Sequence, residues 1–468
     1  MKAILDFITG PLNTVAWLYI LLPCVAIGGV LFTVLNRGMQ FTKFGYAMKN
    51  TIGKVFQKQK AEAGAVTPFQ ALTTALAATV GTGNIIGTSQ AIAMGGYGAI
   101  FWLWIAALLG MIIKYSEVTL SVHYRKRNEK GDWIGGPMYY IEAGLGKNWK
   151  WLAVLFATFA SLASFGIGNL SQANSITGSI NGAVTAFIPG LAEKKDLINL
   201  ILGILLAVLT AAALFGGIKC IGKVTELLIP FMSLFYIIFA LIVIVSNASG
   251  VGAAFGKIFA AAFTPRAVMG AASGIALKEA LVWGLRRSAF SNEAGLGSAA
   301  IAHAAAQTEG PVQQGLFGIF EVFVDTIVIC TLTGLTIIVS GVDIAFGVKP
   351  GAEIITAAFG TVFGQKFASL FVAIALAFFA YSTILGWSLY GTRCFEYLFG
   401  MKVTKIYQLI FVVMIVVGAT TSLDVVWDVA DTFNGLMAIP NFVALFALSG
   451  VVAKLTKEYF SKQKTLKK

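Results

Sequence analysis

Charged side chains are scarce in this sequence. Only 12% of its 468 residues are Asp, Glu, Lys or Arg, whereas a soluble domain carries roughly 25%. Hydrophobic residues make up 57% of the chain. This composition excludes a soluble globular domain and predicts an all-α protein that crosses a membrane many times.

Histidine and cysteine are also rare, which limits metal and redox chemistry. The two histidines, His123 and His303, lie far apart in the sequence, and none of the four cysteines has metal-ligand spacing. We therefore expect no metal centre and no disulfide framework. The cysteines are Cys24, Cys220, Cys330 and Cys394.

The net charge of +13 has two possible explanations. Binding of nucleic acid requires basic side chains on one folded face, but here they lie in short loops between apolar runs. We therefore expect no nucleic-acid partner. The basic loop 36–67 and the basic tail 453–468 are instead expected to touch anionic lipid headgroups.

Eleven apolar runs are long enough to span a bilayer. The first has no signal-peptide cleavage site and is followed by a basic loop, so we expect it to be retained. The predicted spans are 12–35, 68–92, 97–123, 150–183, 197–217, 224–247, 268–302, 313–341, 363–391, 406–422 and 425–452.

The distribution of Lys and Arg predicts the orientation. If residue 1 is external, the internal segments carry 23 basic residues, including Lys150 at an edge, and the external segments carry six. Positive charge accumulates on the cytoplasmic side. We therefore predict a protein of the cell membrane with an external amino terminus and a cytoplasmic carboxyl terminus.

The number of spans predicts an inverted repeat. After the first span, ten remain in two groups of five, and the second group crosses the membrane in the opposite sense. Segment 250–267 is amphipathic and is expected to form an external cap or gate. The predicted organisation is an extra helix with a basic loop over 1–67, repeats over 68–247 and 248–452, and a tail over 453–468.

Each repeat begins with an interrupted apolar run, ThrValGlyThrGlyAsn at 79–84 and PheSerAsnGluAlaGlyLeuGly at 290–297. Unwound backbone at membrane depth is tolerated where it lines a cavity or binds a ligand. In the first interruption the NH groups of Thr82, Gly83 and Asn84 are expected to point at an anion such as a carboxylate. Close packing of helices at the glycines is the alternative.

Charged residues crowd the second interruption. Charges at membrane depth generally face a partner, so an Arg–Glu pair among Arg286, Arg287 and Glu293 is the simplest explanation. Direct contact of Glu293 or Arg287 with a substrate is the alternative. Phe290 and Ser291 are better placed to line a pocket.

Polar residues in other spans are further candidates. Gln172, in GlyAsnLeuSerGlnAlaAsnSer at 168–175, can bind a ligand or join two helices. Ser382 and Thr383 offer adjacent hydroxyls to a hard cation such as sodium, although each can also bond its own helix backbone. Trp387 lies one turn beyond Thr383 on the same face.

Three carboxylates, Glu117, Glu321 and Asp325, also fall within spans, and the last two share a helix face. A proton relay is conceivable. A hydrogen-bonded structural role is the favoured prediction, because no His or paired Lys provides an obvious route for a proton.

These motifs together resemble the alanine or glycine:cation symporter family of sodium-coupled carriers. GlyGlyTyrGlyAlaIlePheTrpLeuTrpIle at 95–105 is similar to the signature of that family, with Leu103 in place of the usual Met. Blocks in the fourth, seventh and ninth spans are also similar, so the resemblance covers about 66–450. Ser288 and Ala300 stand where the family usually has glycine and proline.

The resemblance implies a leucine-transporter fold and a substrate site at the membrane midplane. The carboxylate of a small neutral amino acid is then held by NH groups of Thr82, Gly83 and Asn84. The residues implied around its amine and side chain are Gln172, Phe290, Ser291, Thr383 and Trp387.

The resemblance also implies a sodium site between the first broken helix and the ninth span. Its ligands are carbonyl and hydroxyl oxygens of Ala77, Val80, Phe379, Ser382 and Thr383. Sodium is then the coupling ion, and we expect no other cofactor.

The predicted function is sodium-driven symport of alanine or glycine by alternating access. A proton-coupled or glutamine-preferring carrier of the same fold is the nearest alternative. An intramembrane enzyme using Ser291 or Glu293 lacks a plausible His or Lys base. A passive channel requires a pore lined by polar rings, whereas the polar residues here cluster at the interruptions.

Overall fold

The computed structural model describes residues 2–55, 61–263, 277–421 and 424–465, and most of them are helical. Within these ranges, nine helices are long and apolar enough to cross a membrane. They are Ile4–Leu35, Ala99–His123, Lys147–Phe187, Pro189–Phe215, Gly217–Ser246, Pro311–Ser340, Gln365–Phe399, Met401–Thr420 and Val429–Ala447.

These nine helices correspond to nine of the predicted spans, but four ends differ from the prediction by seven or eight residues, namely the starts at Ile4, Pro189 and Gly217 and the end at Phe399. The first begins at Ile4 rather than at 12, and polar Asn13 does not end it because its side chain bonds Asp431 and Thr432. The ninth span continues from the predicted 391 to Phe399 and stops at Gly400, whose φ of 82° ends the helix.

The other two predicted spans are broken helices. In the span predicted at 68–92, α5 (Pro68–Thr79) is followed by the π-helical turn η3 (Gly83–Gly87) and α6 (Thr88–Gly95). In the span predicted at 268–302, α14 (Leu277–Asn292) and α15 (Ala299–His303) flank an irregular stretch, and 268–276 lies outside the described residues. The total of about eleven spans therefore stays a prediction.

The other elements of the amino-terminal half are helices and one short β-hairpin. β1 and β2 pair antiparallel. The bounds are α1 (Lys2–Phe7), η1 (Ile8–Leu12), η2 (Val15–Leu21), α2 (Leu22–Leu35), α3 (Met39–Thr42), α4 (Phe44–Val55), α7 (Ala99–His123), β1 (Lys126–Arg127), β2 (Trp133–Ile134), α8 (Pro137–Leu145), η4 (Lys147–Trp149), α9 (Lys150–Phe165), η5 (Gly166–Leu170), α10 (Ser171–Phe187), η6 (Pro189–Lys194), α11 (Lys195–Phe215) and α12 (Gly217–Ser246).

The carboxyl-terminal half contains α19, the longest α-helix without a π-helical turn among the described residues, which packs against both α5 and α10. The bounds are α13 (Ala248–Phe263), α16 (Pro311–Val322), η8 (Phe323–Cys330), α17 (Thr331–Ser340), α18 (Glu353–Phe363), α19 (Gln365–Phe399), η9 (Met401–Val403), α20 (Thr404–Thr420), α21 (Asp424–Ala447) and α22 (Ser449–Thr465).

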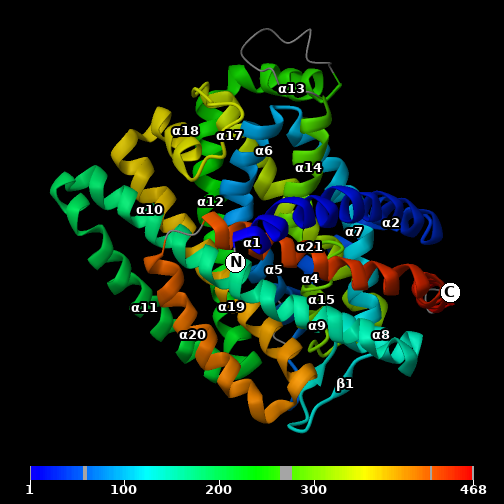
Figure 1. Ribbon diagram of the computed structural model, residues 1–468. Coiled ribbons are helices and arrows are strands. Elements are labelled where there is room, and N and C mark those ends of the chain that lie inside the picture. Colours follow the sequence, from blue (N-terminus) through cyan, green and yellow to red (C-terminus); the bar gives the residue numbers. More distant parts are fainter. Residues whose placement is uncertain (1, 56–60, 264–276, 422–423, 466–468) are drawn as a thin grey trace.

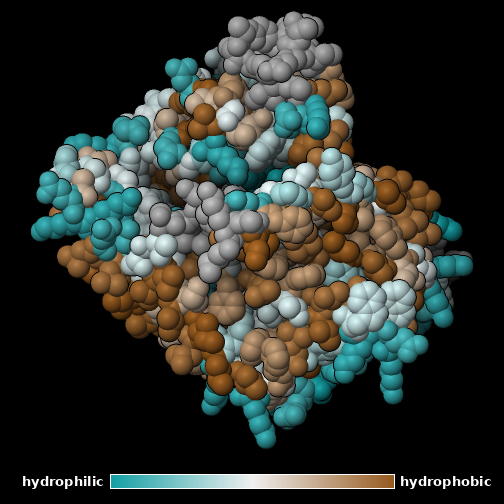
Figure 2. Space-filling view, viewed as in Figure 1, coloured by the Kyte–Doolittle hydropathy of each residue, from teal (hydrophilic) through white to brown (hydrophobic). Residues whose placement is uncertain are grey.

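A band of exposed apolar side chains crosses one face of the molecule, where lipid is expected. Figure 2 shows it as a broad brown region across the visible face, with teal polar side chains below it. Large apolar residues are exposed on α11 and α20, including Ile204, Val208, Leu409 and Val413. Burying these side chains in lipid is favourable, so the band marks the membrane-facing surface.

The helix α13 crosses one end of the molecule, and the β1–β2 hairpin lies at the opposite end (Figure 1). α13 packs against α7, α14 and α17. Segment 250–267 was expected to form a surface cap, and its described part, through residue 263, lies within this crossing helix. Its role as a gate stays a prediction.

Close packing of α14 on α7 requires a glycine at position 284. A Cβ added there would lie 2.4 Å from the carbonyl oxygen of Ala99, and a backbone atom cannot yield easily. We expect Gly284→Ala to lower the apparent melting temperature in detergent, because overpacking costs about 1 to 3 kcal/mol. Gly252→Ala in α13 is the control, since a Cβ there meets nothing within 4 Å. Equal melting temperatures would show that α14 shifts without cost.

Candidate functional site

The first broken helix leaves its helical path at Val80, whose ψ of 88° is not helical. The backbone NH of Gly81 then donates to Asn84 Oδ1 at 2.8 Å. Thr82, Gly83 and Asn84 are all buried. The predicted interruption at 79–84 is therefore present, and its backbone is tied down by a side chain of the same segment.

The second broken helix is irregular from Glu293 to Ser298. Glu293 has φ of 56°, a region that residues other than glycine rarely adopt, and Gly295 and Gly297 have φ of 92° and 78°. Three left-handed residues in so short a stretch account for the glycines in the motif at 290–297. They also leave NH groups without helical partners.

A buried carboxylate satisfies those NH groups. Glu117 Oε1, from α7, accepts from the NH of Gly295 at 3.0 Å and from the NH of Gly297 at 3.1 Å. Asn441 of α21 donates to the same oxygen at 2.7 Å and to the carbonyl of Gly295 at 2.9 Å. Glu117 thus has the hydrogen-bonded structural role that the sequence favoured, in contact with the irregular segment.

The two broken helices meet at Gly83. A Cβ at this position would lie 3.3 Å from both Phe290 Cδ1 and Ser291 Cα. The missing side chain is therefore what allows the two segments to approach closely. Residues predicted from separate motifs, about 200 positions apart, are brought side by side.

A second carboxylate, Asp325 of η8, connects the two segments. Its Oδ1 accepts from Asn84 Nδ2 at 2.7 Å, and its Oδ2 accepts from Ser291 Oγ at 2.9 Å and from Thr326 Oγ1 at 2.6 Å. The side chains of Asn84 and Ser291 thus bind Asp325. A structural role was predicted for Asp325, but its link to both interruptions was not predicted.

The oxygens proposed for sodium come together where the first broken helix crosses α19. Ser382 Oγ lies 3.4 Å from the carbonyl oxygen of Val80 and 2.8 Å from that of Phe379. Thr383 Oγ1 donates to the same Phe379 carbonyl at 3.0 Å, so both hydroxyls bond the backbone of their own helix, which was the alternative to a sodium site. A Cβ on Gly81 would be 2.3 Å from Thr383 Oγ1. Ala77, three residues before Val80, is also fully buried.

Trp387 faces the second broken helix. Its Nε1 donates to Glu293 Oε1 at 2.8 Å, and Ser298 Oγ donates to the other oxygen of Glu293 at 2.5 Å. A Cβ added to Gly168 would lie 2.1 Å from the Cβ of Trp387, so Trp387 packs directly on the backbone of η5. Gln172, which follows η5, is buried, and its Oε1 has no hydrogen-bond partner among the described residues.

The expected pairing within the second interruption is wrong for Arg286 and Glu293. Arg286 forms its ion pair with Asp431 of α21, and the hydrogen-bond partners of Glu293 are Trp387 and Ser298. Sequence proximity suggested the pair. Arg286 lies within α14, whereas Glu293 follows the end of that helix, and the Arg286 side chain reaches the neighbouring helix α21 instead.

The expectation that Glu321 has no His or Lys partner is also wrong. Lys114 Nζ lies 3.5 Å from Glu321 Oε1, and His303 Nε2 lies 3.0 Å from Glu321 Oε2. Gln314 Nε2 lies 2.9 Å from the other ring nitrogen, His303 Nδ1. All these side chains are buried. Lys114, the one lysine or arginine in the apolar run at 97–123, was the signal that the sequence offered.

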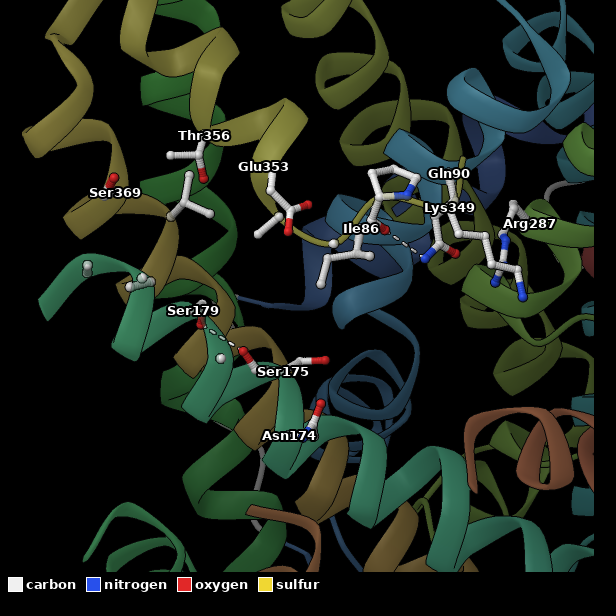
Figure 3. A pocket seen from close by; sticks show the side chains of 18 of the residues that line it. Ile86, Gln90, Asn174, Ser175, Ser179, Arg287, Lys349, Glu353, Thr356 and Ser369 are labelled. Atoms are coloured by element: carbon white, nitrogen blue, oxygen red, sulfur yellow. Dashed lines mark hydrogen bonds between the residues drawn. The ribbon is translucent and has the colours of Figure 1, made fainter. Parts of the chain in front are cut away.

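A cavity of about 720 Å³ is lined by residues of α10, α14 and α18, among other segments. Figure 3 shows its polar lining, with Asn174, Ser175 and Ser179 of α10 facing Glu353. Among the predicted substrate residues that the structure describes, Phe290 alone lines the cavity. Gly83 and Ser291, in contact with Phe290, are buried beneath it. The predicted site is therefore closed off from the cavity by this ring.

The whole chain, residues 1–468, matches the model of the sodium:alanine symporter family. It belongs to that family. It is 43% identical to the sodium/alanine symporter AgcS of Methanococcus maripaludis over 97% of this chain and 98% of that protein. It is 36% identical to the probable sodium/glutamine symporter GlnT of Bacillus subtilis, over 99% and 92%.

The fold is that of the leucine transporter, as the resemblance implied. The structure superposes on MhsT in complex with L-phenylalanine with a TM-score of 0.59, covering 86% of this chain and 99% of that one at 13% identity. Family and fold together identify a multi-pass membrane protein and a secondary transporter. The family implies sodium as its coupling ion.

Asp325→Asn tests whether the hydrogen bonds of the Asp325 carboxylate stabilise the fold. In Asp325→Asn one acceptor oxygen becomes an NH₂ donor, so at least one of Asn84, Ser291 and Thr326 loses its acceptor. Hydrogen bonds to charged groups contribute about 1.5 to 3 kcal/mol each. We expect the apparent melting temperature in detergent to fall by several degrees.

The matched control is Asp343→Asn, because Asp343 is exposed. If both variants melt at the temperature of the parent, the bridge between the two broken helices contributes nothing to stability.

Proposed function

We propose that this protein imports a small neutral amino acid, alanine or glycine, together with sodium. The observation that carries the proposal is the group of oxygens formed by Val80, Phe379, Ser382 and Thr383 at the crossing of α5 and α19. Sodium is a hard cation that binds neutral oxygens and carbonyls freed by a helix break. Ala77 contributes a further carbonyl in this proposal.

The amino acid binds beside the sodium, between the two broken helices. Its carboxylate accepts from backbone NH groups of Thr82, Gly83 and Asn84, at the positive end of the half-helix that follows. Support for backbone rather than side-chain recognition comes from Asp325, which already occupies the side chains of Asn84 and Ser291. Gln172 Oε1, buried without a partner among the described residues, suits the amine.

Phe290 and Trp387 set the size limit in this proposal. Both rings are buried, and Trp387 is held by Glu293 and by the backbone of η5. Rings fixed in this way leave little room for a long side chain. Their bulk supports alanine or glycine over glutamine, the substrate in the name of the relative GlnT.

Transport proceeds by alternating access, in which one helix bundle rocks against the rest of the protein around the midplane site. With the amino terminus external, the 720 Å³ cavity opens to the outside and the structure is outward-facing with a closed site. The basic residues of loop 36–67 and tail 453–468 then face the cytoplasm and its anionic lipid headgroups.

The sodium gradient is an adequate energy source. One charge crossing about 100 mV contributes about 2.3 kcal/mol, and a roughly tenfold sodium gradient adds about 1.4 kcal/mol. Together they support accumulation of roughly a few hundredfold.

The deciding experiment is uptake of radiolabelled alanine and glycine into proteoliposomes, with sodium, lithium or choline outside and an imposed membrane potential. Sodium-dependent, potential-driven accumulation supports the proposal. Accumulation driven by a proton gradient without sodium, or preferential uptake of glutamine, supports the related carriers instead. Passive equilibration indicates a channel, and formation of a product indicates an enzyme.

Thr383→Ala tests the ion site. Removing a hydroxyl ligand from a small oxygen cage is expected to raise the sodium concentration for half-maximal uptake by about tenfold, with little change in substrate ranking. Thr392→Ala is the control, because Thr392 lies on the same helix and its hydroxyl bonds the carbonyl of Ser388. A sodium titration identical to that of the parent would remove Thr383 from the ion site.

Trp387→Ala tests the substrate pocket. Shortening the side chain is expected to shift preference from alanine toward valine or leucine, since each methylene in an apolar pocket is worth about 1 to 3 kcal/mol. Competition of labelled alanine uptake by amino acids from glycine to leucine measures the shift. Trp151→Ala, at an exposed position, is the control. An unchanged ranking would assign the size limit to another residue, Phe290 first.

A further inference from the structure

The first helix reaches the edge of the cavity, although it lies outside the two five-span repeats. Arg286 of α14 and Asp431 of α21 line the cavity and form an ion pair. Asn13, between η1 and η2, and Trp17, in η2, contact this pair. Three segments that are distant in the sequence therefore meet at one charged cluster.

Asn13 bonds both members of the ion pair. Its Nδ2 donates to Asp431 Oδ2 at 3.0 Å and to Thr432 Oγ1 at 3.0 Å, and its Oδ1 accepts from Arg286 Nη2 at 2.9 Å. The same oxygen of Asp431 also accepts from Arg286. One amide thus fixes the carboxylate in the position where the guanidinium meets it.

Trp17 supports the pair from the other side. Its Nε1 donates to the carbonyl oxygen of Asp431 at 2.9 Å, and the guanidinium carbon of Arg286 lies 5.1 Å from the centre of its ring. The ring is buried because α21 carries Gly435 here, where a Cβ would lie 3.0 Å from Trp17 Nε1. The indole therefore holds both the backbone of Asp431 and the charge of Arg286.

The charged cluster is connected to the closed site through α14. Arg286 lies one helical turn before Phe290 on α14, so the two side chains move together with the second broken helix. Asp431 belongs to α21, which packs against η1 and η2. When Arg286 separates from Asp431, the second broken helix therefore moves away from α21 and the first helix. The ring of Phe290, which lies over the site, moves with it.

We propose that Asn13 and Trp17 are positioning residues of a latch at the cavity edge, holding Asp431 against Arg286 and slowing release of the bound amino acid into the cavity. This inference rests on the proposed function. The first helix, an addition to the repeat, then controls the lifetime of the closed site without touching the substrate.

The test is the dissociation rate of labelled alanine from the full-length protein in sodium, measured by rapid filtration after an excess of unlabelled alanine is added. We expect Asn13→Ala and Trp17→Phe to release alanine about three- to tenfold faster than the parent, because each removes a hydrogen bond to the latch. Thr14→Ala and Tyr19→Phe, at exposed positions of the same helix, are the controls and should release it at the rate of the parent.

A double variant separates the latch from a general loss of structure. If Asn13 acts through Asp431, adding Asn13→Ala to Asp431→Asn should change the rate little further. Fewer binding sites with an unchanged rate would mean that the first helix is only structural, which overturns the latch. A parent that binds alanine with sodium while all variants release it at the same rate also overturns the latch but leaves the transport proposal intact. A parent that does not bind alanine overturns both.

Discussion

The structure depends on satisfying backbone groups that two broken helices expose inside the membrane. No water is available there, and each unpaired NH or carbonyl costs several kcal/mol. Buried carboxylates supply the partners. Glu117 accepts from two NH groups of the second interruption, and Asp325 binds the side chain of Asn84, which in turn accepts from the NH of Gly81. Each interruption is thereby fixed in one conformation.

This arrangement separates the groups that hold the site from those proposed to bind its contents. The side chains of Asn84, Ser291 and Glu293 are bonded to other protein groups. In the proposed site, backbone NH groups bind the carboxylate, and the ion is bound by carbonyl oxygens together with hydroxyls that here bond their own helix. A site built from backbone suits the carboxylate that all amino acids share, and the rings of Phe290 and Trp387 are the groups that we propose to select by size.

The sequence predicted the interruptions well but their partners poorly. Glycine, threonine and asparagine inside an apolar run are a local signal, and both breaks lie where that signal placed them. The contact of Lys114 and His303 with Glu321 was missed, as was the pairing of Arg286 with Asp431. These contacts join residues from different helices, and nothing in the spacing along one helix specifies which neighbour it will face.

The sequence by itself determined the membrane class, most of the span limits and the two broken helices, because hydropathy and helix-breaking residues act locally. The family resemblance added the leucine-transporter fold. Only the tertiary structure decided that Asp325 joins both interruptions, that Trp387 bonds Glu293 and that the first helix contacts the Arg286–Asp431 pair. The reason is that polar groups in a low-dielectric interior must find partners wherever packing brings them, and packing is a property of all the helices together.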